Sequence, residues 1–175
     1  MTSSVLAPSR PSIPRSVLAL VAFLVISYAV ASLGSIATIT QVDGWYADAD
    51  KVSWSPPNAL FGPVWTVLYA LMSVAAWLVW REKDRRDVRR PLTLYVIQLA
   101  LNAIWTPVFF GLYPVVGVAA LWVAAAIILA LDVLVLMTML AFWRVRRATA
   151  VLLIPYWAWV LFATTLNLGI AVLQS

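Results

Sequence analysis

The stretch Trp54-Ser-Pro-Pro-Asn-Ala-Leu-Phe-Gly-Pro-Val-Trp65-Thr-Val-Leu-Tyr69 joins a polar, aromatic loop to an apolar segment. Two prolines restrict the approach, and Ser55 or Asn58 is suited to cap a helix that begins there. Pro63 then falls inside that helix, and we expect it to kink the helix near its outer end. The stretch therefore predicts a stiff loop followed by a helix that is kinked near its outer end.

Trp65 and Tyr69 are one helical turn apart, so both rings should project from the same face of this helix. A helix mouth lined with large amphipathic rings suits a flat hydrophobic ligand. An aromatic belt at the membrane interface is the alternative interpretation.

The composition identifies a membrane protein. Of the 175 residues, 64% are hydrophobic and 11% are charged, and the mean hydropathy is +0.95. Most of the surface must therefore be apolar and face lipid, and the length fits one domain. The chain has no cysteine and no histidine. This excludes thiol and imidazole nucleophiles, disulfides, the usual zinc sites and the usual haem axial ligands.

Five apolar runs are each long enough to cross a bilayer as a helix. We predict an all-α integral membrane protein, a five-transmembrane-helix bundle with spans at about 17–40, 59–80, 92–111, 115–143 and 150–173. Residues 1–16 are predicted to be a disordered tail, residues 17–175 the membrane domain, and residues 41–58 its longest loop. A signal peptide cleaved before Ser32 is the alternative for the first run. That run continues through Ile36 and Ile39, so we expect a retained membrane helix.

The positions of the basic residues predict the orientation. Two lie in the N-terminal tail, six in the 81–90 loop and three in the 144–147 loop, whereas the opposite side has only Lys51. By the positive-inside rule the N-terminus is cytoplasmic, and the loop 41–58 and the C-terminus are external. We expect a bacterial cell membrane. A nucleic-acid patch at 81–90 is the weaker interpretation, because the charges there have mixed signs and lie between two spans.

The depths of the tryptophans divide them into two groups. Trp65, Trp105 and Trp122 are each on the order of 9 Å inside the outer half of the membrane, deeper than an interfacial belt. Three buried indole N–H groups need acceptors, which a polar stripe on the third span could supply. The stripe comprises Gln98, Asn102 and Thr106; packing between helices is its alternative role. The second group fits a belt at the inner ends and comprises Trp77, Trp80 and Trp143.

Polar and bent positions also occur in the later spans. Pro107 and Pro155 should each free a backbone carbonyl and bend their helices. On the fifth span Trp159, Ala163 and Asn167 share a face, which can form a slot or serve ordinary packing. Asp132 stands alone near the middle of the fourth span, and we interpret it as a neutral hydrogen-bonding acid, with a proton relay as the alternative.

Several motifs together resemble one known family over all five spans, in order. They are Trp45-Tyr46, Lys51-Val-Ser-Trp54-Ser-Pro-Pro-Asn58, Phe61-Gly-Pro-Val-Trp65-Thr-Val-Leu-Tyr69, Leu101-Asn-Ala-Ile-Trp-Thr-Pro-Val-Phe-Phe-Gly111, Pro155-Tyr-Trp-Ala-Trp159 and Phe162-Ala-Thr-Thr-Leu-Asn167. The chain resembles the translocator protein family, whose members are also called tryptophan-rich sensory proteins or peripheral-type benzodiazepine receptors.

The resemblance implies a five-helix bundle, commonly a homodimer, that binds porphyrins, haem and steroids beneath the first long loop. Carried over by motif, the ligand-binding residues are Tyr46, Trp54, Phe61, Trp65, Tyr69, Asn102, Thr106, Trp159 and Ala163. Some bacterial members are associated with light-dependent breakdown of protoporphyrin, and Trp65 and Trp159 match the tryptophans linked to it. No resident cofactor or metal is implied; porphyrin or haem is expected as a ligand.

The chain departs from the family pattern in three places. Val52 and Ala59 stand where many members have proline and tryptophan, so one loop ring is missing. The cholesterol motif of the animal members requires a tyrosine and a basic residue, and the sequence 168–175 has neither. Asp132 also lies several residues from the acidic position that other members have in this helix.

Two functions remain, besides that of a structural membrane subunit with no small-molecule site, against which the depths of Trp65, Trp105 and Trp122 argue. The first is a receptor, sensor or carrier for a porphyrin-like or other flat hydrophobic ligand. The second is an enzyme that degrades that ligand with light and the tryptophans of its pocket. The absence of histidine, cysteine and a carboxylate pair argues against conventional catalysis, so binding is favoured.

Overall fold

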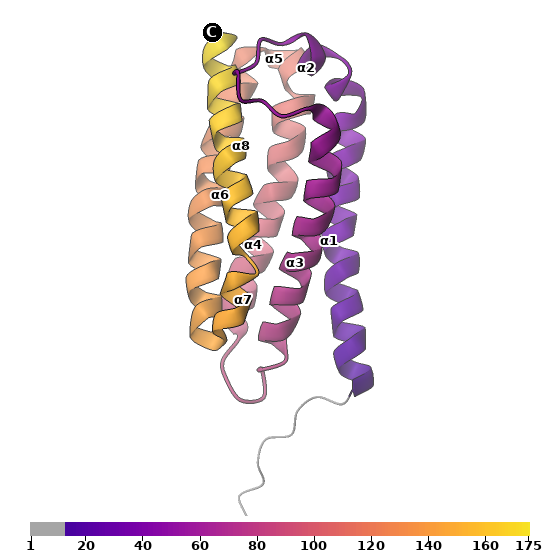
Figure 1. Cartoon of the computed structure of the whole chain (residues 1–175), viewed down its shortest axis with the longest axis vertical. Coiled ribbons are helices and arrows are strands. Elements are labelled where there is room, and N and C mark those ends of the chain that lie inside the picture. The colour runs from indigo at the N-terminus through magenta and orange to yellow at the C-terminus, as the bar shows by residue number, and fades with distance from the viewer. Residues whose placement is uncertain (1–12) are drawn as a thin grey trace, which may run out of the picture.

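The computed structural model describes residues 13–175, apart from the side chains of Ser35, Ala37 and Ile39. Five long helical segments run up and down in a bundle (Figure 1). They are α1 (Ile13–Val42), α3 (Phe61–Trp80), α4 (Arg89–Thr106), α6 (Val118–Val145) and α8 (Ile154–Leu173). Shorter elements are α2 (Trp45–Asp48), the 3-10 turn η1 (Asn58–Leu60), the π-helical turn η2 (Pro107–Gly111), α5 (Tyr113–Val116) and α7 (Arg147–Val151).

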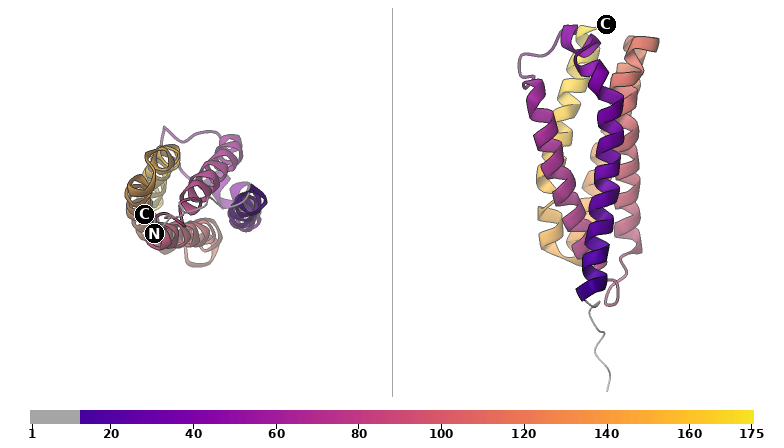
Figure 2. Two further views of the ribbon diagram at one scale, coloured as in Figure 1. Left: turned by 90° about the horizontal axis from the view of Figure 1, so that it is seen from below. Right: turned by 90° about the vertical axis from the view of Figure 1, so that its right-hand side faces the viewer.

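The bundle has two different ends. The loop end carries α2, residues 49–57, α5 and the C-terminus, and the basic end carries residues 81–88 and the turn between α6 and α7 (Figure 1). Helix α1 stands at one side of the bundle and packs against α3 and α4 (Figure 2). Much of its outer surface is apolar and exposed, for example Leu18, Val25 and Ile36.

Five segments are long and apolar enough to cross a membrane. They are Ile13–Gly34, Asn58–Trp80, Arg89–Gly111, Val118–Val145 and Arg147–Leu173. The predicted five-transmembrane-helix bundle is therefore confirmed. The first helix begins at Ile13, so residues 13–16 are helical and do not belong to a tail; residues 1–12 of the predicted tail lie outside the described residues.

The predicted kink at Pro63 is wrong. Helix α3 begins at Phe61, which puts Pro63 in its first turn, where a missing N–H has no partner to lose. The predicted caps are also wrong, because neither η1 nor α3 receives a side-chain hydrogen bond at its N-terminus. The 3-10 turn leads directly into α3, so the chain enters the helix without Ser55 or Asn58 as a cap.

The two spans in which bends were predicted at Pro107 and Pro155 are interrupted near those prolines. Helix α4 changes at Pro107 into the π-helical turn η2, because proline cannot donate the next backbone hydrogen bond. In the last span α7 and α8 are separate, and Pro155 lies in the first turn of α8. Between α5 and α6, Gly117 has φ +63° and ψ −145°, a conformation open to glycine alone.

The basic half of the bundle is densely packed. Met72, Ala75, Ala76 and Val79 of α3 are fully buried, and small side chains let helix backbones approach closely. Polar contacts add to this packing: Ser73 Oγ donates to Ser27 Oγ at 2.9 Å. The loop half is built differently and contains a cavity.

Candidate functional site

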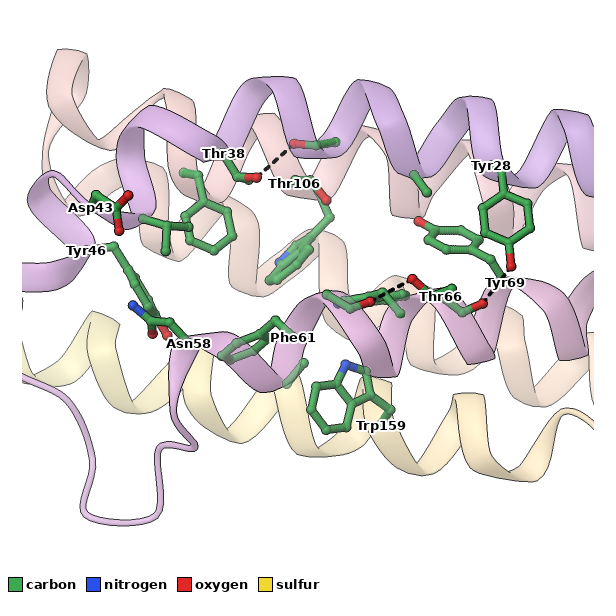
Figure 3. Close-up of a pocket in the computed structure, with 18 residues that line it drawn as sticks. Tyr28, Thr38, Asp43, Tyr46, Asn58, Phe61, Thr66, Tyr69, Thr106 and Trp159 are labelled. Carbon is green, nitrogen blue, oxygen red and sulfur yellow. Dashed lines mark hydrogen bonds between the residues drawn. The ribbon is translucent and has the colours of Figure 1, made fainter.

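A cavity of about 460 Å³ lies near the loop end of the bundle, among α1, α2, α3, α4, η2 and α8 (Figure 3). This volume is within the range of about 300–1,000 Å³ that is typical of small-molecule sites. Seven of the nine residues carried over by motif line it: Tyr46, Phe61, Trp65, Tyr69, Thr106, Trp159 and Ala163. Residues from four parts of the chain that are distant in sequence therefore converge on one space.

Helix α3 supplies one wall of the cavity through Trp65 and Tyr69. The rings of Trp65 and Tyr69 have centroids 5.4 Å apart, as their spacing of one helical turn requires. Trp65 also meets Tyr156 of α8 edge to face, with centroids 6.1 Å apart. The indole is thus held between two tyrosines while one part of it faces the cavity.

Helix α8 supplies another part of the lining through Trp159 and Ala163. Trp159 lies edge to face with Phe61 at 5.8 Å and beside Phe162 at 5.5 Å. Its indole Nε1 is buried and has no hydrogen-bond partner within the described part of the chain. A buried N–H without a partner is costly, and few buried indoles in native proteins have one.

The inner end of the cavity is closed by a buried hydrogen-bond network. Tyr69 OH donates to Asn102 Oδ1 at 2.7 Å, and Asn102 Nδ2 donates to Tyr156 OH at 3.2 Å. Tyr156 OH donates in turn to Gln98 Oε1 at 2.8 Å. Asn102, one of the nine, is therefore behind the wall and not in the lining, because Tyr69 lies between it and the cavity.

The outer end of the cavity is closed by an aromatic cluster. Trp45 stacks on Tyr113 with centroids 3.9 Å apart and donates from Nε1 to the carbonyl of Phe110 at 2.9 Å. Tyr46 meets Phe110 edge to face at 5.2 Å, and Lys51 Nζ lies 4.7 Å from the centre of the Tyr46 ring. Burial raises the pKa of Tyr46, so its phenol remains a neutral donor near pH 7.

The π-helical turn positions part of this cluster. Within η2 the rings of Phe109 and Phe110 are 4.8 Å apart, and Phe110 faces both the cavity and Tyr46. An extra residue in a helical turn shifts the direction of the following side chains, and such turns are frequent at functional sites. The Pro107 that interrupts α4 therefore shapes the outer end of the cavity.

Trp54 is the second of the nine that does not line the cavity. It is 55% exposed, and its Nε1 donates to Thr165 Oγ1 of α8 at 3.2 Å. Pro56 and Pro57 follow it in the loop, which then leads into η1 and α3. Trp54 holds the loop to the bundle from outside.

The two other deep tryptophans differ from each other. Trp105 is buried, and its Nε1 donates to Asn167 Oδ1 at 3.1 Å, an acceptor on α8 and not on the predicted stripe. The prediction that Trp122 is buried is wrong: it is 46% exposed. Its neighbour Leu121 points into the core, and a step of one residue turns a helical side chain by about 100°. Trp122 is also only four residues from the start of α6, at belt depth.

The wall formed by α1 is the part that the sequence reasoning missed. Tyr28, Ala31, Gly34 and Thr38 all line the cavity. Tyr28 OH donates to the carbonyl of Thr66 on α3 at 3.0 Å. A β-carbon on Gly34 would lie 3.4 Å from Thr106 of α4, so the two helices approach closely here. The four-residue and three-residue spacings of this face are the only signal in the sequence, and any packed membrane helix has them.

Asp132 lies away from the cavity. It is buried on α6, and its Oδ2 lies 2.8 Å from Thr164 Oγ1, which also lies 3.0 Å from the Val160 carbonyl. The single hydroxyl proton of Thr164 cannot serve both acceptors, whereas a protonated Asp132 satisfies the pair. The geometry favours the neutral hydrogen-bonding acid.

Comparison with known proteins places the chain in a family. The model of the TspO/MBR family matches residues 22–173. The chain belongs to the TspO/MBR family. It is 37% identical over 161 residues to the tryptophan-rich protein TspO of Archaeoglobus fulgidus, covering 91% of this chain and 99% of that protein. It is 40% identical over 129 residues to the human translocator protein, covering 70% of each.

A bacterial relative has a name that indicates sensing. The chain is 36% identical over 141 residues to the tryptophan-rich sensory protein of Cereibacter sphaeroides, covering 79% of this chain and 84% of that protein. Family membership and the five apolar spans identify an integral, multi-pass membrane protein. The resemblance inferred from the motifs is thereby confirmed.

Proposed function

We propose that this TspO/MBR protein is a membrane receptor, sensor or carrier that binds a porphyrin-like or other flat hydrophobic ligand in the cavity beneath its loop. The observation that carries the proposal is the aromatic lining of the cavity: Phe61, Trp65 and Tyr69 on α3, and Trp159 on α8. Aromatic walls suit a conjugated ring system, because stacked and edge-on contacts both stabilise it.

The ligand should be held through its ring and not through a metal. The chain contains no histidine or cysteine, the side chains that most often ligate haem iron. Metal-free protoporphyrin is therefore expected to bind about as well as haem. A steroid is apolar like a porphyrin but lacks its planar π-system. Comparing the affinities of the two therefore separates the contribution of apolar contact from that of ring stacking.

The test is a titration of the purified protein with protoporphyrin, haem and a steroid, followed by quenching of tryptophan fluorescence. Saturable quenching by both tetrapyrroles with similar affinity supports the proposal. No saturable quenching by any of the three compounds would contradict it. Haem binding that far exceeds protoporphyrin binding would contradict the metal-independent mode.

A light-dependent, porphyrin-degrading enzyme is the second candidate. Trp65 and Trp159, the residues in question, both line the cavity, where a bound porphyrin would lie against two readily oxidised indoles. Light would be absorbed by the porphyrin, and dioxygen would be the oxidant. Degradation of a bound porphyrin that needs both light and oxygen would support this activity.

We further propose the orientation and assembly. The basic end, with residues 81–90 and 144–147, faces the cytoplasm of a bacterial cell membrane, and the loop end faces outward. Reporter fusions after Asp87 and after Arg146 should be cytoplasmic, and one within residues 46–50 should be external. A homodimer is proposed from the family alone and is tested by the oligomeric mass in detergent.

A further inference from the structure

A second hollow lies at the basic end, far from the aromatic cavity. It is a groove of about 380 Å³ between α4 and α6, beside the loop 81–88. Its outer rim carries Arg86, Arg90 and Arg144, and its deeper part is apolar, with Leu94, Met137 and Leu140. Charged and apolar parts therefore meet in one groove.

The rim is positively charged and partly fixed. Arg86 Nη1 donates to the Arg144 carbonyl at 2.7 Å, which holds the guanidinium of the loop over the end of α6. Asp87 also lines the groove, and its Oδ1 accepts the backbone N–H of Arg89 at 3.0 Å. In the part of the chain that the structure describes, no ion pair involves the three arginines. Three positive charges and one negative charge leave the groove with a net charge of +2.

Three other cations at this end have partners of a different kind. Each lies over a tryptophan ring: Arg81 over Trp77 at 5.0 Å, Lys83 over Trp80 at 4.3 Å and Arg147 over Trp143 at 5.4 Å. Those pairs suit the membrane interface, where indoles and cations both reside. Among the described residues no aromatic ring lies under the groove arginines, so their guanidinium N–H groups, apart from the one that Arg86 donates to the Arg144 carbonyl, remain available for an anion.

The apolar part extends from the rim toward the middle of the membrane. Leu94 is one helical turn from Arg90 on α4, and Leu140 is one turn from Arg144 on α6. Met137 lies about one turn further along α6; it is 39% exposed and Leu140 is 58% exposed. A bound molecule would therefore meet cations at the interface and apolar side chains below them.

We infer that this groove binds one anionic phospholipid. Its phosphate lies between the guanidinium groups of Arg86, Arg90 and Arg144, and an acyl chain lies along Leu94, Met137 and Leu140. Guanidinium forks match phosphate oxygens in pairs, and basic pockets between membrane helices suit such head groups. The site is independent of the porphyrin cavity, because the two lie at opposite ends of the bundle.

The test measures lipid binding to the purified full chain by native mass spectrometry in detergent. Dioctanoyl phosphatidylglycerol should bind one per chain and at least about tenfold more tightly than dioctanoyl phosphatidylcholine. The variant Arg86→Gln/Arg90→Gln/Arg144→Gln should lose this preference. Glycerophosphoglycerol, the same head group without chains, should bind much more weakly than the lipid; equal binding would contradict the apolar part of the site.

The matched control removes the same charge at the same end outside the groove: Arg85→Gln/Arg89→Gln/Arg146→Gln. It should keep the preference, and an equal loss in both triple variants would overturn the proposal in favour of a diffuse basic surface. The single variant Arg90→Gln guards against misfolding, because the Arg90 guanidinium donates no hydrogen bond within the described chain. It should weaken phosphatidylglycerol binding with an unchanged melting temperature; unchanged binding would count against the site.

Discussion

The two halves of the bundle use tryptophan in opposite ways. In the loop half, Trp65 and Trp159 turn inward and form walls of a cavity. At the basic end, Trp77, Trp80 and Trp143 each lie below a cation. The residue type is the same, yet one set faces a space that can hold a ligand and the other belongs to the membrane interface.

The packing of α3 explains this difference. Toward the basic end its inward positions are small or aliphatic, such as Ala75, Ala76 and Val79, so the neighbouring helices come close and leave no space. Toward the loop end its inward positions are Trp65 and Tyr69, whose rings are tilted against each other, and Trp65 meets Tyr156 edge to face. The hydrogen-bonded Tyr69, Asn102 and Tyr156 lie where the two kinds of packing meet.

Removing the hydrogen bonds at that boundary should have the largest effect on the stability of the protein. Asn102→Leu leaves the Tyr69 hydroxyl without its acceptor in a buried site, and we expect the free energy of unfolding to fall by about 1–3 kcal/mol. Thermal unfolding in detergent measures this. The control is Thr93→Val, an exposed position on the same helix, which should change little. Equal stability of the Asn102 variant and the control would show that the network is not structural.

The division of the tryptophans is tested next. Trp65→Ala and Trp159→Ala should each weaken porphyrin binding by about 1–1.5 kcal/mol or more, the scale of an aromatic pair. Trp80→Ala and Trp143→Ala, from the basic end, should leave it nearly unchanged. Titration followed by porphyrin absorbance measures all four variants in the same way. Equal losses in all four would remove the distinction between a cavity wall and an interfacial belt.

A milder change separates binding from chemistry in the cavity. Trp65→Phe and Trp159→Phe keep much of the ring, so each should cost less than about 1 kcal/mol of porphyrin binding. They remove the readily oxidised indole, so any light-dependent loss of porphyrin absorbance should become slower. Degradation that continues undiminished in the dark would contradict an indole-assisted photochemical role.

The smallest expected effect concerns the loop of residues 49–57, which covers the half of the bundle that contains the cavity. Thr165→Val removes the acceptor of the exposed Trp54 Nε1 and should loosen residues 49–57 by about 0.5–1 kcal/mol. Hydrogen exchange of the amides in that loop measures the change. Thr93→Val again serves as the control. Exchange equal to that of the control would mean that this hydrogen bond does not hold the loop.

Much of the architecture follows from the sequence alone. The lengths of the apolar runs predict the five spans, because a membrane helix must satisfy its own backbone hydrogen bonds over a bilayer of fixed thickness. The one-turn spacing of Trp65 and Tyr69 predicts a common face, and their rings do lie together. The interruption at Pro107 is equally local, because the missing N–H belongs to that residue.

Contacts between helices could not be obtained in this way. Local pattern gives the depth of a side chain but not the direction it faces, which is why Trp105 is buried and Trp122 is exposed. It also predicted neither the Asn167 acceptor of Trp105 nor the cavity wall formed by α1. The sequence by itself determined the helices and the residue types that they carry. Only the packing of the helices decided which faces enclose a space. In a membrane helix the face toward lipid and the face toward other helices are both apolar, so the residue types do not show which face points inward.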